Sequence, residues 1–196
     1  MSEFTALRAA SMTLQALLER EITSSDNMEY SGVLIHLHSP KFLRESRKSG
    51  ISLWLYMITR EPDTLNRPVE RPVASQIRRR PLPLTLHYLV CALRDEPRDE
   101  QMLLGKVIQV FHDHAVLEAA DLRDSLAGAE ELRLVLDAPS LQELSLVWES
   151  LNEPYQLSVS YTVQVVAIDS DRDRVVAPPV LVSTQQPAQI VAGGGQ

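Results

Sequence analysis

The sequence has few of the residues from which catalytic and metal sites are built. It contains one cysteine, Cys91, so no disulfide can form within the chain, which is typical of a reducing compartment. It has seven glycines, three of them in the GGG run near the C-terminus, which leaves little for a phosphate-binding loop. The motifs G-x-S-x-G, G-x-x-x-x-G-K-[ST] and G-x-G-x-x-G are absent. We therefore expect no enzymatic activity and no cofactor.

Long apolar runs are also missing. No stretch approaches the roughly 20 apolar residues that a helix needs to cross a bilayer. The N-terminus carries Glu3 early and has no apolar segment followed by a small-residue cleavage site. We expect no signal peptide, no insertion into a membrane, and assembly in the cytoplasm.

The overall composition is that of an ordinary globular protein. Of its 196 residues, 44% are hydrophobic and 23% are charged, which suffices for one sizeable core. The last residues are rich in proline, glutamine and glycine and offer little apolar surface for folding. We expect a single domain over residues 1–174 and a flexible tail over 175–196.

Hydrophobic periodicity predicts three main helices and five strands. An amphipathic pattern predicts a helix over 3–22. Acidic residues around Pro97 indicate the start of a second helix. The capping-box pair Ser140 and Glu143 indicates the start of a third helix, which ends near Leu151. The expected strands are 32–38, 51–60, 82–91, 131–138 and 154–169. The fold class is α+β, with a mixed or antiparallel sheet of four to five strands and helices packed mainly on one face.

One connection, residues 61–80, is unusual in length and composition. Its prolines exclude a helix interior and a central strand, and it has no sustained period. Connections of this length tend to be functional or to reach a partner. We interpret it as an extended Pro/Arg-rich arm between two core strands.

Two H-x-H pairs suggest metal ligands. His36 and His38 would share one face of a strand, whereas His112 and His114 lie at a helix end, where residues two apart do not face each other. Zinc requires at least a third protein ligand, and neither Cys91 nor an E-x-x-H pattern supplies one. We expect no metal site.

Charge is unevenly distributed in a chain whose net charge is −7. Residues 41–80 hold 10 basic and 4 acidic residues, and residues 113–153 hold 2 basic and 10 acidic residues. A basic and an acidic surface on one chain can attract copies of itself or complementary neighbours. A nucleic-acid or anion-binding adaptor would use the same arginines, but the acidic chain and the lack of aromatic residues in the arm disfavour nucleic acid.

Four blocks of the sequence resemble the tail-terminator, or cap, proteins of phage-tail-like contractile injection systems. In chain order they are SLWLYMITREPDTLNRP, RRRPLPLTLHYLVCAL, EQMLLGKVIQVFHDHAVL and LRLVLDAPSLQELSLVWESLNEPYQLSVSYTVQVVAID. The likeness runs from the N-terminal helix to about Asp169. It implies a structural protein of a phage-tail-like particle, a six-fold ring on the distal end of the inner tube and sheath that ends their growth and joins them. An assembly chaperone of the same particle is an alternative.

The arginines in and beside the arm are the candidate partner interface. Arginine favours carboxylate-bearing surfaces because its planar fork makes bidentate contacts. The alternative is that the triple arginine keeps a strand end soluble and deters edge pairing. The proposed interface consists of Arg60, Arg67, Arg71, Arg78, Arg79 and Arg80.

Overall fold

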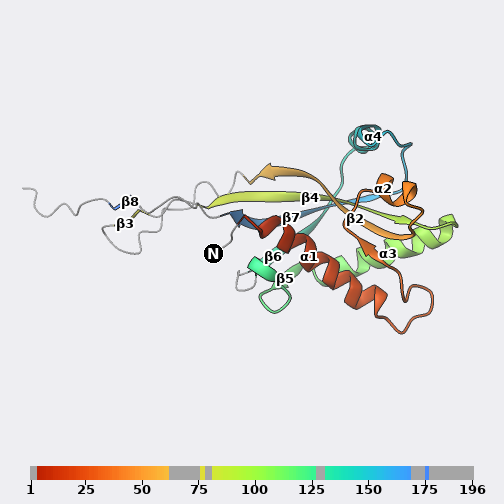
Figure 1. Ribbon diagram of the computed structural model, residues 1–196, viewed down its shortest axis with the longest axis horizontal. Helices are drawn as coiled ribbons and strands as arrows, with labels where there is room; N and C mark the ends of the chain where they lie inside the picture. Colours follow the sequence, from red (N-terminus) through yellow and green to blue (C-terminus); the bar gives the residue numbers. More distant parts are fainter. Residues whose placement is uncertain (1–3, 62–75, 78–80, 127–130, 169–174, 177–196) are drawn as a thin grey trace, which may run out of the picture.

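The computed structural model describes residues 4–61, 76–77, 81–126, 131–168 and 175–176 (Figure 1). Its helical segments are α1 (Ala6–Leu18), the π-helical turn η1 (Glu19–Thr23), α2 (Pro40–Glu45), α3 (Pro97–Asp113), the 3-10 turn η3 (Asp124–Leu126) and α4 (Leu141–Ser150). Its strands are β1 (Ile35–His36), β2 (Gly50–Arg60), β3 (Gln76–Ile77), β4 (Leu82–Leu93), β5 (Val116–Glu118), β6 (Glu131–Asp137), β7 (Val159–Ile168) and β8 (Val175–Val176).

Six strands form one mixed sheet in the order β1-β2-β4-β7-β6-β5. The pair β1 and β2 is parallel, and the other neighbours are antiparallel. The predicted α+β class with a mixed sheet is thus confirmed. Within this sheet, the strand that the sequence did not indicate is β5, which is only three residues long and cannot show a period of two.

The larger core lies on the sheet face covered by α1 and α3. Alternate residues of β4, from Leu84 to Ala92, point to this face and pack with apolar side chains of both helices. Tyr88 lies at its centre, fully buried, and its hydroxyl lies 2.8 Å from Ser11 Oγ of α1. Helices are therefore packed mainly on one face, as expected, because this cluster takes most of the buried apolar residues.

A smaller core lies on the opposite face, beneath α2 and α4 (Figure 1). Leu89, Cys91 and Leu93 of β4 point to this side and pack with Leu43 of α2 and Trp148 of α4. β4 is thus buried on both faces along its C-terminal half, which is why its sequence there is almost continuously apolar.

Local signals in the sequence set the helix starts. Pro97 occupies the first turn of α3, where its missing N–H is not needed. The capping box of α4 is present as predicted: Ser140 Oγ accepts from the N–H of Glu143, and the Glu143 carboxylate accepts from the N–H of Ser140.

Two strands differ from the expectation. The aromatic and branched residues of 51–60 suggest a strand buried on both faces, but the side chains of β2 are exposed from Met57 onward. The C-terminal strand begins at Val159 rather than at 154, and Ser160 and Thr162 on its polar face are buried. Ser160 Oγ lies 3.4 Å from the hydroxyl of Tyr56 on β2, which reaches it across β4.

Part of the arm and part of the tail are paired with each other. β3 pairs antiparallel with β8, Gln76 opposite Val176 and Ile77 opposite Val175. The rest of the predicted arm after Glu61 and before Pro81, and the tail after Val176, lie outside the described residues. The proposed division of the chain at residue 174 stays a prediction.

Candidate assembly surface

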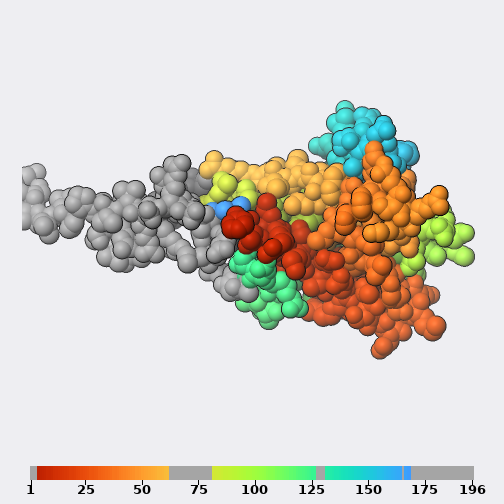
Figure 2. Space-filling model, in the orientation of Figure 1, coloured from red at the N-terminus to blue at the C-terminus, as the bar shows by residue number. Residues whose placement is uncertain are grey.

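The described part of the predicted arginine interface is Arg60, the last residue of β2. Its side chain is exposed, and Figure 2 shows the light-orange residues of β2 at the molecular surface. The other five arginines of the prediction lie outside the described residues: Arg67, Arg71, Arg78, Arg79 and Arg80. The six-arginine surface therefore stays a prediction.

The end of the sheet around Arg60 is held together by polar contacts. Thr59 Oγ1 lies 2.8 Å from His87 Nε2, and Thr85 Oγ1 donates to the carboxylate of Glu61 at 2.7 Å. The N–H of Glu61 donates to the carbonyl oxygen of Pro83 at 3.1 Å, which continues the β2–β4 ladder beyond the strand. These contacts fix the backbone from which the arm departs.

The described part of the basic segment is concentrated around α2. Ser39 caps this helix, and Lys41, Arg44, Arg47 and Lys48 follow within it or just after it. Arg44 is bound internally, with its guanidinium 3.3 Å from the Glu153 carboxylate. Arg47 and Lys48 are exposed and have no carboxylate partner among the residues that the structure covers.

Acidic side chains gather at the other border of the sheet. Asp113 ends α3, Glu118 lies on β5 and Asp137 ends β6, and within the described ranges none of the three forms an ion pair. Two further carboxylates of the acidic segment, Asp121 and Asp124, are occupied by Arg20 and Arg8 of the first helical region. Within the acidic segment, the described carboxylates without an ion pair therefore include those along β5 and at the end of β6, as well as Glu149 of α4.

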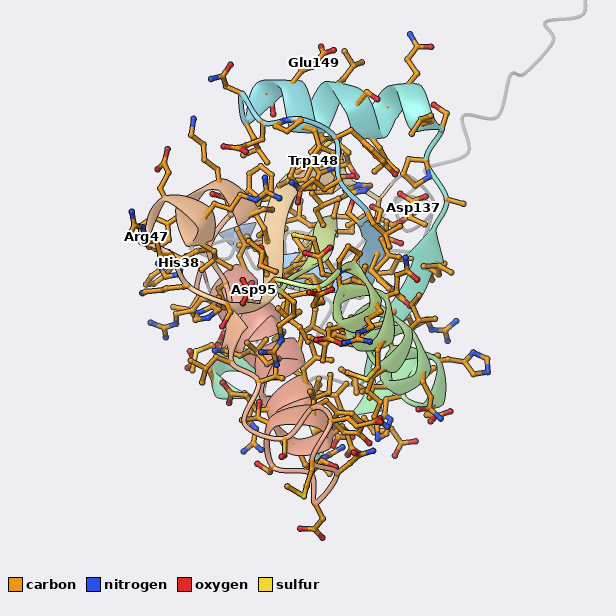
Figure 3. The ribbon with its side chains drawn as sticks, turned by 90° about the vertical axis from the view of Figure 1, so that its right-hand side faces the viewer. His38, Arg47, Asp95, Asp137, Trp148 and Glu149 are labelled. Atoms are coloured by element: carbon orange, nitrogen blue, oxygen red, sulfur yellow. The ribbon has the colours of Figure 1, made fainter. Side chains whose placement is uncertain are left out.

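The sheet order places these two groups on opposite sides of the molecule. α2 connects β1 to β2 at one border, and β6 and β5 form the other. Viewed from the end that carries α4, Arg47 and His38 lie on one side and Asp137 on the other (Figure 3). Sequence reasoning found the two charged segments, but not that β4 and β7 would separate them.

The histidines do not converge on one site. His36 Nε2 lies 3.2 Å from the carbonyl oxygen of Ser49, while the ring of His38 stacks on Phe42 with centroids 4.3 Å apart. His114, which caps α3, has its Nε2 3.2 Å from the guanidinium of Arg20. In the described part of the chain, no three His, Cys, Asp or Glu side chains lie close enough to hold a metal ion.

Cys91 is an interior residue of the smaller core. Its side chain is buried, and burial raises the pKa of the thiol to about 12, against a smaller opposing effect of the Ser52 hydroxyl. A thiol with so high a pKa is not a nucleophile at neutral pH. Cys91 therefore packs as a small buried hydrophobe.

Exposed apolar side chains accompany the charged ones. Phe42 lies beside Lys48, whose Nζ is 5.6 Å from the ring centroid, and Val135 and Leu136 directly precede Asp137. Apolar groups rimmed by charge are typical of surfaces that bind other proteins. None of the helices in the described ranges has the length and apolar character that a bilayer crossing requires.

Comparison with known proteins gives one family and two similar folds. The family model of the Pvc16 N-terminal domain matches residues 9–181. The chain is similar to the PVC sheath/tube terminator of an extracellular contractile injection system in its extended state (18% identity, TM-score 0.61, 95% of this chain and 65% of that one). It is also similar to the tube-terminating cap of the anti-feeding prophage (18% identity, TM-score 0.61, 90% of this chain and 60% of that one). No curated protein matches significantly. The chain thus spans less than two thirds of each of these two structures.

Proposed function

The chain belongs to the family of the Pvc16 N-terminal domain, and from this we propose that it is a structural terminator that caps the tube and sheath of a contractile injection system. The family resemblance that the sequence predicted is confirmed by the family match and by both similar structures.

One observation carries this proposal: the fold is shared, over nearly the whole chain, with a sheath/tube terminator and with a tube-terminating cap. The two structures come from two particles, and both proteins are terminators of a tube. The shared fold and family therefore support a terminator role for this chain.

We further infer that the chain works as a closed ring of identical copies, six-fold as the resemblance implies, and that it transforms no substrate. The distribution of charge supports a head-to-tail ring, because such a ring needs two different complementary surfaces on each copy. A buried thiol of high pKa and histidines that point to different partners support a role in binding rather than catalysis.

The arginines at the end of β2 and in the arm are proposed to contact tube or sheath subunits. Arg60 is exposed at the end of β2, and the predicted arm begins with the next residue, Glu61. The test is Arg79→Glu/Arg80→Glu, which we expect to reduce capping of particle ends. Normal capping and normal particle length in this variant would refute the arginine interface.

The terminator role itself is tested by electron microscopy of particles that carry an epitope-labelled chain. We expect label at one end of each particle, and particles of irregular length or with separated sheath when the chain is omitted. Particles of normal length without the chain, or label along the whole sheath, would contradict the proposal.

A further inference from the structure

The two borders of the sheet carry surfaces that match each other in charge. We define the basic edge as Phe42, Arg47 and Lys48, at the end of α2, and the acidic edge as Glu118, Val135, Leu136 and Asp137, on β5 and β6. Each edge combines exposed apolar side chains with charges that lack an ion-pair partner among the described residues. Leu136 is 53% exposed and Phe42 is 40% exposed.

Among the described residues, the acidic edge also has strand backbone without a partner strand. β5 pairs with β6 at Glu131, Leu132 and Arg133, and Leu134 donates its N–H to the carbonyl oxygen of Ala115. Beyond that point, β6 pairs only with β7, up to Asp137 opposite Ser160. An exposed apolar strand segment of this kind is a surface that proteins usually cover.

Arg47 occupies a backbone position that does not favour arginine. It has φ +52°, in the left-handed region that glycine or asparagine adopts most easily. The turn is held by backbone bonds alone, from Arg47 N–H to Arg44 O at 2.9 Å and from Lys48 N–H to Leu43 O at 2.8 Å. The described contacts therefore give the Arg47 side chain no role in the fold, which leaves it free for a partner.

We propose that the basic edge of one copy docks on the acidic edge of the next copy, so that Arg47 and Lys48 face Asp137 of a second identical chain, with Glu118 farther along the same border. This contact rests on the proposed ring and specifies its interface. A symmetric contact would bring like charges together, whereas a head-to-tail contact pairs opposite charges and covers both sets of apolar groups. Because the edges lie on opposite borders of one sheet, each copy can bind two neighbours at once (Figure 3).

The proposal is tested with two charge-reversal variants, Arg47→Glu/Lys48→Glu and Glu118→Lys/Asp137→Lys. Each makes both edges of a copy the same sign, so each alone should need at least about tenfold more protein for half-assembly. All four side chains lie on the surface or are half-buried and make no ion pair in the described structure, so the fold should be retained. The readout is the oligomer mass at low salt, by analytical ultracentrifugation or native mass spectrometry.

The decisive experiment mixes the two variants in equal amounts. The reversed basic edge of the first variant then meets the reversed acidic edge of the second, with opposite charges again across every contact. We expect rings to return, with the two variants in a 1:1 ratio. A matched control, Arg98→Glu/Lys106→Glu, makes the same charge change on α3 outside both edges and should assemble as the unmodified chain does.

A second test avoids charge reversal. Arg47→Asn removes the cation but suits the left-handed backbone, so thermal stability should stay equal or rise while association weakens. Unchanged assembly in Arg47→Asn and in both reversal variants would overturn the inference. So would a mixture that stays monomeric while the unmodified chain forms rings.

The outcomes separate this inference from the proposed function. If unmodified and edge variants form rings equally well and still label particle ends, the copies meet through other surfaces and the terminator role stands. If the edge variants form normal rings but lose capping, the edges bind tube or sheath instead. If the unmodified chain never labels a particle end, the terminator role fails whatever its oligomer mass.

Discussion

Trp148 should be the residue that holds α4 on the sheet. It is the one fully buried side chain of this helix, 1% exposed, and it packs in the smaller core with Leu89 and Cys91. Its Nε1–H donates to Ser158 Oγ at 3.2 Å, which ties the helix to the segment that leads into β7. We predict that Trp148→Ala releases α4 while the larger core stays folded.

The size of the effect follows from the buried area. A tryptophan buries about 150–250 Å², which at about 25 cal/mol per Å² corresponds to ~4–6 kcal/mol. Measured Trp→Ala changes in cores cost about 3–5 kcal/mol, and a Ser158 hydroxyl without its donor adds up to about 1 kcal/mol. We expect the free energy of unfolding to fall by roughly 4 kcal/mol, a large share of the ~5–15 kcal/mol that folded domains have.

Urea denaturation followed by far-ultraviolet circular dichroism measures this loss. Trp148→Phe, which keeps a ring and removes the N–H donor, should lose only about 1–2 kcal/mol. Hydrogen exchange should show the amides of α4 opening in Trp148→Ala without global unfolding, whereas those of α1 exchange only through it. A loss below about 1 kcal/mol, or α4 and α1 still opening together, would refute the reasoning.

Three further predictions concern single positions of the fold. Gly50 has φ +132°, and a Cβ there would overlap the carbonyl oxygen of Leu34, so Gly50→Ala should lower the denaturation midpoint by the equivalent of about 2 kcal/mol or more. Ser140→Ala removes the capping box of α4 and should cost about 1 kcal/mol, measurable by the same denaturation. Burial raises the pKa of Tyr88 from 10.0 to about 12, so the neutral phenol is favoured in the folded state. This raised pKa stabilises the folded state by about 3 kcal/mol below pH 10. The stabilisation is lost as the pH rises from 10 to about 12. Tyr88→Phe should flatten the alkaline fall in stability, and an unchanged pH profile would contradict this.

The sequence predicted the elements with strong local signals. Ser140 and Glu143 marked the start of α4, and Pro97 marked the first turn of α3, because capping and proline geometry depend on neighbours in the chain. The period of two assigned the faces of β4 correctly, with Leu86 and Tyr88 in one core and Leu89 in the other.

Errors arose where tertiary contacts decide burial. In α3 the helical period places Ile108 on the buried face with Leu104 and Phe111, but Ile108 is half-buried and Val110 is buried, because the packing of α3 against β4 sets which side is covered. The strand expected over 32–38 is only Ile35–His36, because the chain then turns into the cap of α2. Periodicity shows which residues alternate, but not where a neighbouring strand stops pairing with them.

The charges of the candidate surface also could not be predicted from the sequence alone, because the fold decides which of them form ion pairs. A count along the sequence gives residues 113–153 a net charge of −8, but it treats each carboxylate alike. The fold brings Arg8 to Asp124 and Arg20 to Asp121, more than 90 positions away in the chain, and so neutralises the acidic residues nearest to α1. Among the described residues, the charge beside β5 and β6 stays without an ion pair, and only the strand order shows that it lies across the sheet from Arg47. An attraction between two copies therefore depends on which charges the fold leaves unpaired, more than on how many the segment contains.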